Sequence, residues 1–403
     1  MNTLLHALFG ALRHHRWLRW LSCAFIFTSL GNGLTQVVFL GLLLDWNTSG
    51  SLLTLAWLFA TLPGFAGSLL GEKLCQRFSP FAVLIVAEVA GLLALLFPLA
   101  ALHFHSVSAL LMVQSMEALL GGMSWPALTL LFKRGLTQAE LPAATCLENI
   151  IFASQVLLGT GVGVMLYQEV SPGVLLAFDA ASFAGSLLML RLAGGAFAAP
   201  HGDAFAEGTP PPALRWRTLK PAQKRALLML PALAAVGAPA MSLLPALAQQ
   251  ISPSDATGLA LPLLFARSMG QLCGPLLLKK EQLPRYASQN RILLSCLSIF
   301  LLAYGVVPFL TGLQTLASGM IFIAHVASNI VFAVGTFGIL HHFQTASIAE
   351  ASGKAWRWQM ISGACFTCIT ALVAARLGAT GAFYTVSGCA LVLVAILALR
   401  YQK

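Results

Sequence analysis

Residues 193–225 read AGGAFAAPHGDAFAEGTPPPALRWRTLKPAQKR and divide the chain into two parts of similar length. The stretch contains three consecutive prolines and ends in a basic run, whereas nearly unbroken apolar sequence lies on both sides of it. A Pro-rich polar segment cannot bury enough apolar surface to fold alone. We therefore interpret 193–225 as a linker between an N-terminal part, 1–192, and a C-terminal part, 226–403.

The two parts show signs of an internal duplication. Sequence around Gly67 resembles sequence around Gly274, and the first apolar runs of the two parts begin near Trp20 and Leu227. Both pairs are separated by the same 207 residues. This common offset favours two copies of one structural unit.

The composition indicates that lipid is the solvent of this chain. Apolar residues make up 58% of the 403 residues and charged residues only 9%, whereas soluble domains carry about 25% charged residues. A membrane-spanning helix needs about 20 apolar residues, and the sequence predicts an all-α membrane protein with twelve transmembrane helices in two six-helix pseudo-repeats. The twelve apolar runs are 20–43, 51–70, 80–102, 107–132, 143–167, 172–192, 227–248, 257–278, 292–312, 315–340, 357–375 and 381–399.

The basic residues predict the orientation of these helices. With twelve spans, 21 of the 23 Lys and Arg residues fall on the side that holds both termini and the linker. Because Lys and Arg are enriched in cytoplasmic loops, we expect that side to be the cytoplasm. The net charge of +10 then reflects topology, and we expect no nucleic-acid partner.

Five segments of the N-terminal part carry recognisable motifs: SLGNG at 29–33, the stretch from Gly67 to Arg77, LPAATCL at 141–147, LLGTGVG at 157–163 and FDAASF at 178–183. Together they resemble the major facilitator superfamily of secondary transporters, and more narrowly its bacterial siderophore, macrolide and multidrug exporters. Two positions depart from the usual patterns: Gly71 takes the place of an Asp, with Glu72 one residue later, and Thr160 stands where a Pro is usual.

The resemblance implies a monomeric transporter of the bacterial inner membrane that works by alternating access on a small-molecule substrate. It implies no catalytic residue, cofactor or enzyme activity. In the loop that gates such transporters, Gly67 and Leu69 match the usual signature, and Glu72 and Arg77 are the expected gating residues beside them. Glu148 near the cytoplasmic end of the fifth span is expected to gate or anchor. Adjacent histidines such as His341 and His342 point about 100° apart on a helix, so we expect no metal site.

Ionisable residues inside the spans are the strongest candidates for coupling, because such groups are costly in a membrane and tend to be functional or paired. Glu117 lies in the fourth predicted span and Arg267 in the eighth. We hypothesise that they face one cavity and that Arg267 alters the proton affinity of Glu117; a static ion pair or two unrelated charges are the alternatives. Glu88 in the third span is a second proton candidate or a structural group. We expect Asp179 in the sixth span either to fix a neighbouring helix or to take part directly in function.

Uncharged polar residues form the candidate substrate site. Asn32 and Gln36 are four residues apart and share a helix face, as do His325 and Asn329. The resemblance places the helices of both pairs at a central cavity, although a membrane His also serves as a helix–helix hydrogen bond. The complete candidate set is Asn32, Gln36, Gln114, Gln271, His325 and Asn329.

The sequence therefore predicts proton-coupled export of an amphipathic small molecule, a siderophore or a drug. The alternatives are a proton-coupled importer of a nutrient or metal chelate, a lipid flippase of the same fold, and a membrane-embedded assembly or sensor protein. The first two alternatives differ from export in what moves and in which direction, and the last predicts no substrate-dependent flux.

Overall fold

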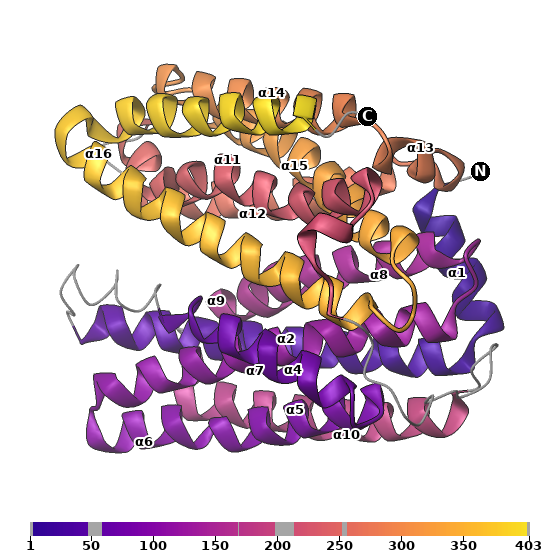
Figure 1. Cartoon of the computed structure of the whole chain (residues 1–403). Helices are drawn as coiled ribbons and strands as arrows, with labels where there is room; N and C mark the ends of the chain where they lie inside the picture. Colours follow the sequence, from indigo (N-terminus) through magenta and orange to yellow (C-terminus); the bar gives the residue numbers. More distant parts are fainter. Residues whose placement is uncertain (1–2, 47–58, 168, 198–212, 252–255, 401–403) are drawn as a thin grey trace. The chain divides into compact units, whose positions relative to one another are not determined.

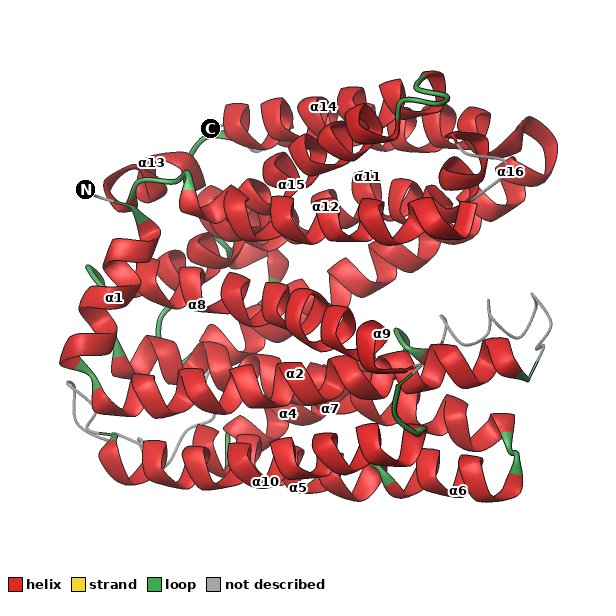
Figure 2. Cartoon of the chain, turned by 180° about the vertical axis from the view of Figure 1, so that it is seen from behind, coloured by secondary structure: helices red, strands yellow, loops and turns green. Residues whose placement is uncertain are grey.

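The computed structural model describes residues 3–46, 59–167, 169–197, 213–251 and 256–400. Within these ranges the chain is helical apart from short turns and an isolated antiparallel bridge between Thr3 and Lys279 (Figures 1 and 2). The predicted all-α class is confirmed. Residues 51–58 of the predicted run 51–70 and residues 198–212 of the linker lie outside the described residues.

The described residues before the linker form most of the first six predicted spans. The fifth span is composite, since two α-helices flank a six-residue π-helix, η1. The elements are α1 (Leu4–His14), α2 (Arg16–Asp45), α4 (Pro63–Cys75), α5 (Pro80–Ala94), α6 (Leu96–Phe104), α7 (Val107–Gly135), α8 (Leu141–Ser154), η1 (Gln155–Thr160), α9 (Gly161–Tyr167) and α10 (Pro172–Ala196).

The described residues from 213 onward form the remaining spans and several short helices. They are η2 (Trp216–Thr218), α11 (Pro221–Ile251), α12 (Ala256–Leu276), η3 (Lys280–Gln282), α13 (Leu283–Ala287), α14 (Asn290–Val306), η4 (Val307–Phe309), α15 (Gln314–His342) and α16 (Ile348–Arg400). Of these, η2 and the first turn of α11 fall within the predicted linker.

The described part of each predicted apolar run overlaps one or more of these helices. Nine helices within the described residues are long and apolar enough to cross a membrane, by length and composition. The last of them, α16, contains two predicted runs in its 53 residues, because Gly378 interrupts it with φ 70° and ψ 174°. Glycine adopts this conformation without the steric cost that a Cβ brings, so Gly378 forms the turn between two spans.

Local sequence explains where several helices begin. A proline occupies the first position of α4, α5, α10 and α11, where its fixed φ suits a helix and its missing N–H costs nothing. The side chain of Ser79 accepts a hydrogen bond from the Ala82 N–H and caps α5, and Ser106 does the same for α7 through Ala109. These caps satisfy donors that a helix cannot satisfy itself.

The chain divides into two compact units. We call Leu8–Ala213 with Gln344–Arg357 the N-terminal unit, and Met1–Ala7 with Leu214–Phe343 and Trp358–Lys403 the C-terminal unit. In the N-terminal unit α2 packs on α10, and α7 packs on both α4 and α5. In the C-terminal unit α15 packs against α11, α12 and α14.

Small residues allow close helix packing at two places in the N-terminal unit. A Cβ added to Gly67 of α4 would lie 1.9 Å from the carbonyl oxygen of Leu119 in α7. A Cβ added to Gly33 of α2 would lie 2.3 Å from the Cα of Gly159 in the π-helix. Such small-residue contacts are typical of helix association in membranes, and they hold α2 directly against η1.

Candidate substrate-binding and proton-coupling site

A cavity of about 170 Å³ lies inside the N-terminal unit, between α2, α5, α7 and the composite span α8–η1. Two candidate proton-coupling residues, Glu88 of α5 and Glu117 of α7, both line it. Thr28 and Asn32 of α2 and Gln155 of η1 add polar groups to the same wall. The structure therefore brings two acids and several uncharged polar side chains from four spans to one space.

Each cavity carboxylate has a hydrogen-bond partner. The Thr28 hydroxyl donates to Glu88 Oε2 at 2.9 Å, and Gln114 Nε2 donates to Glu117 Oε2 at 3.3 Å. Glu88 is 7% exposed. The hydrogen bonds orient both carboxylates but supply no positive charge.

Asp179 of α10 is a third buried carboxylate in this unit, fully enclosed between α10 and α2. The Thr35 hydroxyl donates to Asp179 Oδ2 at 2.5 Å, and the Ser182 hydroxyl donates to Oδ1 at 3.1 Å. Asp179 is close enough to interact electrostatically with both Glu88 and Glu117. The hydrogen bond from Thr35 therefore crosses the interface between α2 and α10.

The described ion pairs involve other acids: His15 with Glu140, Lys354 with Glu350, and Arg357 with Glu72. Within the described residues, Glu88, Glu117 and Asp179 lie on apolar helices and are held by hydrogen bonds from uncharged side chains. An unpaired charge in such a place is costly. Binding of a proton or of a cationic group removes that cost.

A second polar cluster lies in the C-terminal unit around His325 of α15. His325 Nε2 is 2.9 Å from the Tyr304 hydroxyl of α14, and both side chains are buried. The charge of Arg267 on α12 acts on both of these side chains. The structure thus groups two predicted site residues with a tyrosine.

Several candidate substrate residues carry buried polar atoms to which the described residues offer no hydrogen-bond partner. They come from both units, and a bound polar molecule or water satisfies such atoms. The atoms are Asn32 Oδ1, Arg267 Nε, Gln271 Oε1 and His325 Nδ1.

Asn329 is engaged within its own helix. Its Nδ2 donates to the His325 carbonyl at 3.2 Å, one turn earlier in α15. Helix α12 approaches closely here, because a Cβ added to Gly270 would lie 2.9 Å from the His325 Cβ, and one added to Gly274 would lie 3.2 Å from that of Asn329. This contact fixes His325 and Asn329 against α12.

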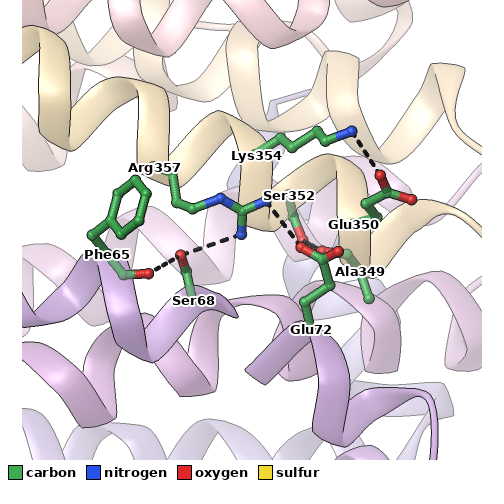
Figure 3. Close-up of polar contacts among 8 residues, drawn as sticks. All are labelled: Phe65, Ser68, Glu72, Ala349, Glu350, Ser352, Lys354 and Arg357. Atoms are coloured by element: carbon green, nitrogen blue, oxygen red, sulfur yellow. Dashed lines mark hydrogen bonds and ion pairs between the residues drawn. The ribbon is translucent and has the colours of Figure 1, made fainter. Parts of the chain in front are cut away.

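A polar contact joins α4 to the beginning of α16 within the N-terminal unit (Figure 3). Arg357 Nη2 donates to Glu72 Oε2 at 3.0 Å, and Nη1 approaches the Ser68 hydroxyl at 3.4 Å. The side chains of Arg357 and Glu72 are 9% and 17% exposed. Glu72, which stands one residue late in the signature loop, therefore does hold an ion pair.

The other candidates lie elsewhere. Gln36 is half-buried in α2 and is not among the residues that line the cavity. Arg77 is exposed beyond the end of α4, and Glu148 is buried in α8. Glu117 and Arg267 belong to different units, so their expected contact stays a prediction.

One acid outside the spans has a well-defined environment. Glu140 precedes α8, accepts from the backbone N–H and the hydroxyl of Thr137 at 3.0 and 2.8 Å, and lies 2.9 Å from His15 Nε2. Burial acts to raise the pKa of Glu140, but these hydrogen bonds outweigh it and hold the pKa below its ordinary value. The contact connects the start of α2 to the start of α8.

Sequence reasoning missed four residues of these clusters: Thr28, Gln155, Tyr304 and Arg357. Thr28 and Tyr304 are ordinary residues in apolar spans, and only their contacts distinguish them. Arg357 was counted as a loop charge; its partner Glu72 is 285 residues away in the sequence. For Thr28 the sequence offered one signal, since it is a polar residue four positions before Asn32.

Several solved structures of membrane transporters share this fold. The chain is similar to the crystal structure of a bacterial homologue of the iron transporter ferroportin in the outward-facing state, with a TM-score of 0.70 and 14% identity over 95% of this chain and 98% of that one. For the human organic anion transporter MFSD10 the TM-score is 0.67, with 15% identity over 95% and 99%. For the major facilitator superfamily proton:xylose symporter XylE it is 0.66, with 13% identity over 96% and 95%. These similarities show the fold: a multi-pass membrane protein of major facilitator architecture.

Sequence comparison is more limited. No family model matches the chain. A segment of 74 residues is 58% identical to an "uncharacterized 29.9 kDa protein in crtE 3'region" of Pseudescherichia vulneris. The match covers 18% of this chain and spans only 27% of the length of that relative.

Proposed function

We propose that the chain is a proton-coupled secondary transporter that works by alternating access and exports an amphipathic small molecule across the bacterial inner membrane. The observation that carries this proposal is the cavity lined by Glu88 and Glu117 inside a protein of major facilitator fold. In folds of this type substrate and coupling-ion sites lie near the middle of the bilayer.

The two cavity acids support proton coupling. A carboxylate in a low-dielectric space changes its proton affinity when water, substrate or an opposite charge enters. Glu117 is the primary carrier in this proposal, with Glu88 or His325 as rivals, and Arg267 modulates Glu117 when the two units bring them together. Alternation between states that do and do not expose Glu117 then links proton movement to substrate movement.

The cavity walls support an amphipathic substrate. Phe25 and Phe183 line the same space as the acids, and aromatic faces bind apolar and cationic groups. Asn32 adds an amide whose Oδ1 lacks a partner among the described residues. A siderophore or a drug with both apolar and polar parts fits this combination.

The ion pair between Glu72 and Arg357 supports a gate. It joins α4 to α16 at 3.0 Å, and breaking a partly buried ion pair leaves an uncompensated charge. We propose that this pair stabilises one of the two transport states, together with Gly67, whose missing side chain permits the close approach of α4 to α7. Arg77 and Glu148 are further gating candidates.

Proton-coupled import of a nutrient or metal chelate is the second candidate. It draws on the similarity to a proton:xylose symporter, since the same fold and the same kind of coupling serve uptake there. A lipid flippase of the same fold is the third candidate. All three share the coupling acids and differ in what moves and in which direction.

The test compares metabolites in cells and medium for a deletion strain and its parent, grown in iron-rich and iron-poor medium. We expect one compound to be depleted outside and to accumulate inside the deletion strain. The wild-type gene restores the distribution, as does the matched control Glu169→Gln, which changes an exposed acid in a loop. Glu117→Gln restores it by less than a tenth.

Other outcomes correct specific parts of the proposal. A compound left unconsumed outside the deletion strain establishes import and refutes export. Transport by Glu117→Gln with the pH dependence of the wild type removes Glu117 from the coupling role. A change confined to the lipid distribution between leaflets establishes the flippase instead.

A further inference from the structure

A second cavity, of about 130 Å³, lies within the C-terminal unit between α11, α14 and α16. We call it the α11–α14–α16 groove. Its walls are almost wholly apolar and include Leu228, Ala232, Phe366 and Leu393. Leu393 is 47% exposed, and the neighbouring Val392 and Ile396 of α16 are 61% and 59% exposed. The groove therefore opens at an apolar, lipid-facing surface of α16.

One end of the groove is polar. Arg225 lies there in the first turns of α11 and donates through Nη1 to the Ser288 carbonyl at 2.5 Å. Asn290, at the start of α14, lines the same end and donates to the carbonyl of Ala398 in α16. These contacts show that the start of α11, the start of α14 and the end of α16 meet at this end.

The polar end is strongly basic. Lys224 and Arg225 come from α11, Arg291 is exposed at the start of α14, and Arg400 ends α16. Among the described residues, the acid nearest in sequence to these cations is Glu281, which belongs to the short η3. An anionic group is the charge-complementary occupant of this rim.

The apolar wall has the depth of one membrane leaflet. The lining residues of α11 run from Arg225 to Ala235, a rise of about 15 Å at ~1.5 Å per residue. That is about half of the ~30 Å hydrocarbon core of a bilayer. The groove thus combines a basic rim with an apolar channel whose length along α11 matches about half of a bilayer core.

We propose that the α11–α14–α16 groove binds one acyl chain of an anionic phospholipid and holds its phosphate at Arg225. Basic pockets between transmembrane helices on the cytoplasmic side bind anionic headgroups, and a guanidinium matches a phosphate in charge and geometry. The site lies within one unit and is separate from the substrate cavity. Its occupancy does not depend on which compound the protein transports.

The test is native mass spectrometry of the purified full-length chain, titrated with phosphatidylglycerol or with phosphatidylcholine of the same acyl chains. We expect a single phosphatidylglycerol to bind at least fivefold more tightly than phosphatidylcholine. Arg225→Gln removes this preference because the phosphate loses its cation. Ala232→Leu weakens both lipids because the added side chain fills the groove.

The matched control is Arg217→Gln, which removes an exposed cation outside the groove and leaves the lipid preference unchanged. Thermal melting of all variants checks that they are folded. If one of the groove variants, Arg225→Gln or Ala232→Leu, does not fold, the other alone tests the proposal. Equal binding of the two lipids by the wild type overturns the proposal. So does an unchanged lipid preference in Arg225→Gln, an unchanged affinity for both lipids in Ala232→Leu, or a dimer that seats a second copy of the chain in the groove.

Discussion

The hydrogen bonds around Glu140 make its protonation state part of the stability of the folded chain. Its pKa in the folded protein lies below the ordinary value of 4.5. The deprotonated form is therefore the one that folding stabilises, and its contribution is complete above pH 4.5 and is lost as the pH falls through the folded pKa. The pair is partly exposed, so the contribution is small, about 0.5–1 kcal/mol.

The measurement is the thermal midpoint of wild type and Glu140→Gln from pH 7 to pH 3. We expect the variant to melt lower at pH 7 and the difference to shrink towards zero below pH 4.5. Glu169→Gln, an exposed acid in another loop, serves as the control and changes little at any pH. A difference in thermal midpoint that stays constant from pH 7 to pH 3 contradicts a lowered pKa of Glu140 in the folded protein.

At this scale the sequence identifies charges better than it identifies their partners. Glu88 and Glu117 stand out because an acid in an apolar run is rare, and both line one cavity. Thr28 and Tyr304 could not be singled out, because hydroxyls are common in spans and their roles come from contacts made in space. The pairing of Glu72 with Arg357 depends on packing between distant segments, which no local pattern encodes.

At the scale of elements, the contact between α2 and the π-helix leaves no room for a side chain. Gly33→Ala places a Cβ 2.3 Å from the Gly159 Cα, where backbone faces backbone and neither side yields easily. We expect a loss of about 1–3 kcal/mol, as for other overpacked sites, measured as a lower thermal midpoint. Gly195→Ala in α10, where no atom lies within 4 Å, is the control, and an equal effect of both variants would falsify the close contact.

The ion pair between α4 and α16 is testable by a double-mutant cycle. Glu72→Gln and Arg357→Gln each leave one charge without its partner. We therefore expect the double variant to lose less stability than the two single losses added together. The expected coupling is about 1–3 kcal/mol, measured by denaturant unfolding in detergent.

The pair Glu350 and Lys354 on the first turns of α16 provides the comparison, since it is an i, i+4 contact at 2.6 Å within one helix (Figure 3). A similar cycle there should give only about 0.3–0.5 kcal/mol. Equal coupling energies in the two cycles would mean that the ion pair between α4 and α16 stabilises the fold no more than the pair within one helix.

The helices themselves were predictable because a span is defined by length and apolarity, and the described part of each predicted run overlaps a helix. The irregular parts were not. The π-helix at Gln155–Thr160 differs from an α-helix by its hydrogen-bond register, which leaves no trace in apolar composition. Gly378 was one glycine among 35, and its positive φ could not be read from the sequence.

At the scale of the whole molecule, the basic residues make a topological prediction. We expect the linker and the C-terminus in the cytoplasm and the turn at Gly378 on the opposite side. Alkaline phosphatase, which is active only outside the cytoplasm, should be active when fused at that turn and inactive after Arg400. Green fluorescent protein should give the reverse pattern, and a fluorescent fusion at the Gly378 turn would refute the topology.

The overall architecture followed from features spread over the whole chain: the proline-rich linker, the regular spacing of apolar runs and the one-sided charge. Such features survive errors at individual residues, which is why they predicted the fold class. The grouping of Gln344–Arg357 with the N-terminal unit was not anticipated, because it arises from packing of the start of α16 rather than from position in the sequence.

The π-helix also affects how this chain is compared with others. A π-turn holds one residue more than an α-turn, so each residue after Thr160 is rotated by about 100° relative to an uninterrupted helix. A helical wheel drawn for 141–167 as one α-helix therefore assigns the wrong face to α8 or to α9. A relative with a regular fifth span aligns correctly only with a one-residue gap inside that helix, so loss of a single residue from 155–160 during evolution would regularise the helix while both ends of the span keep their faces.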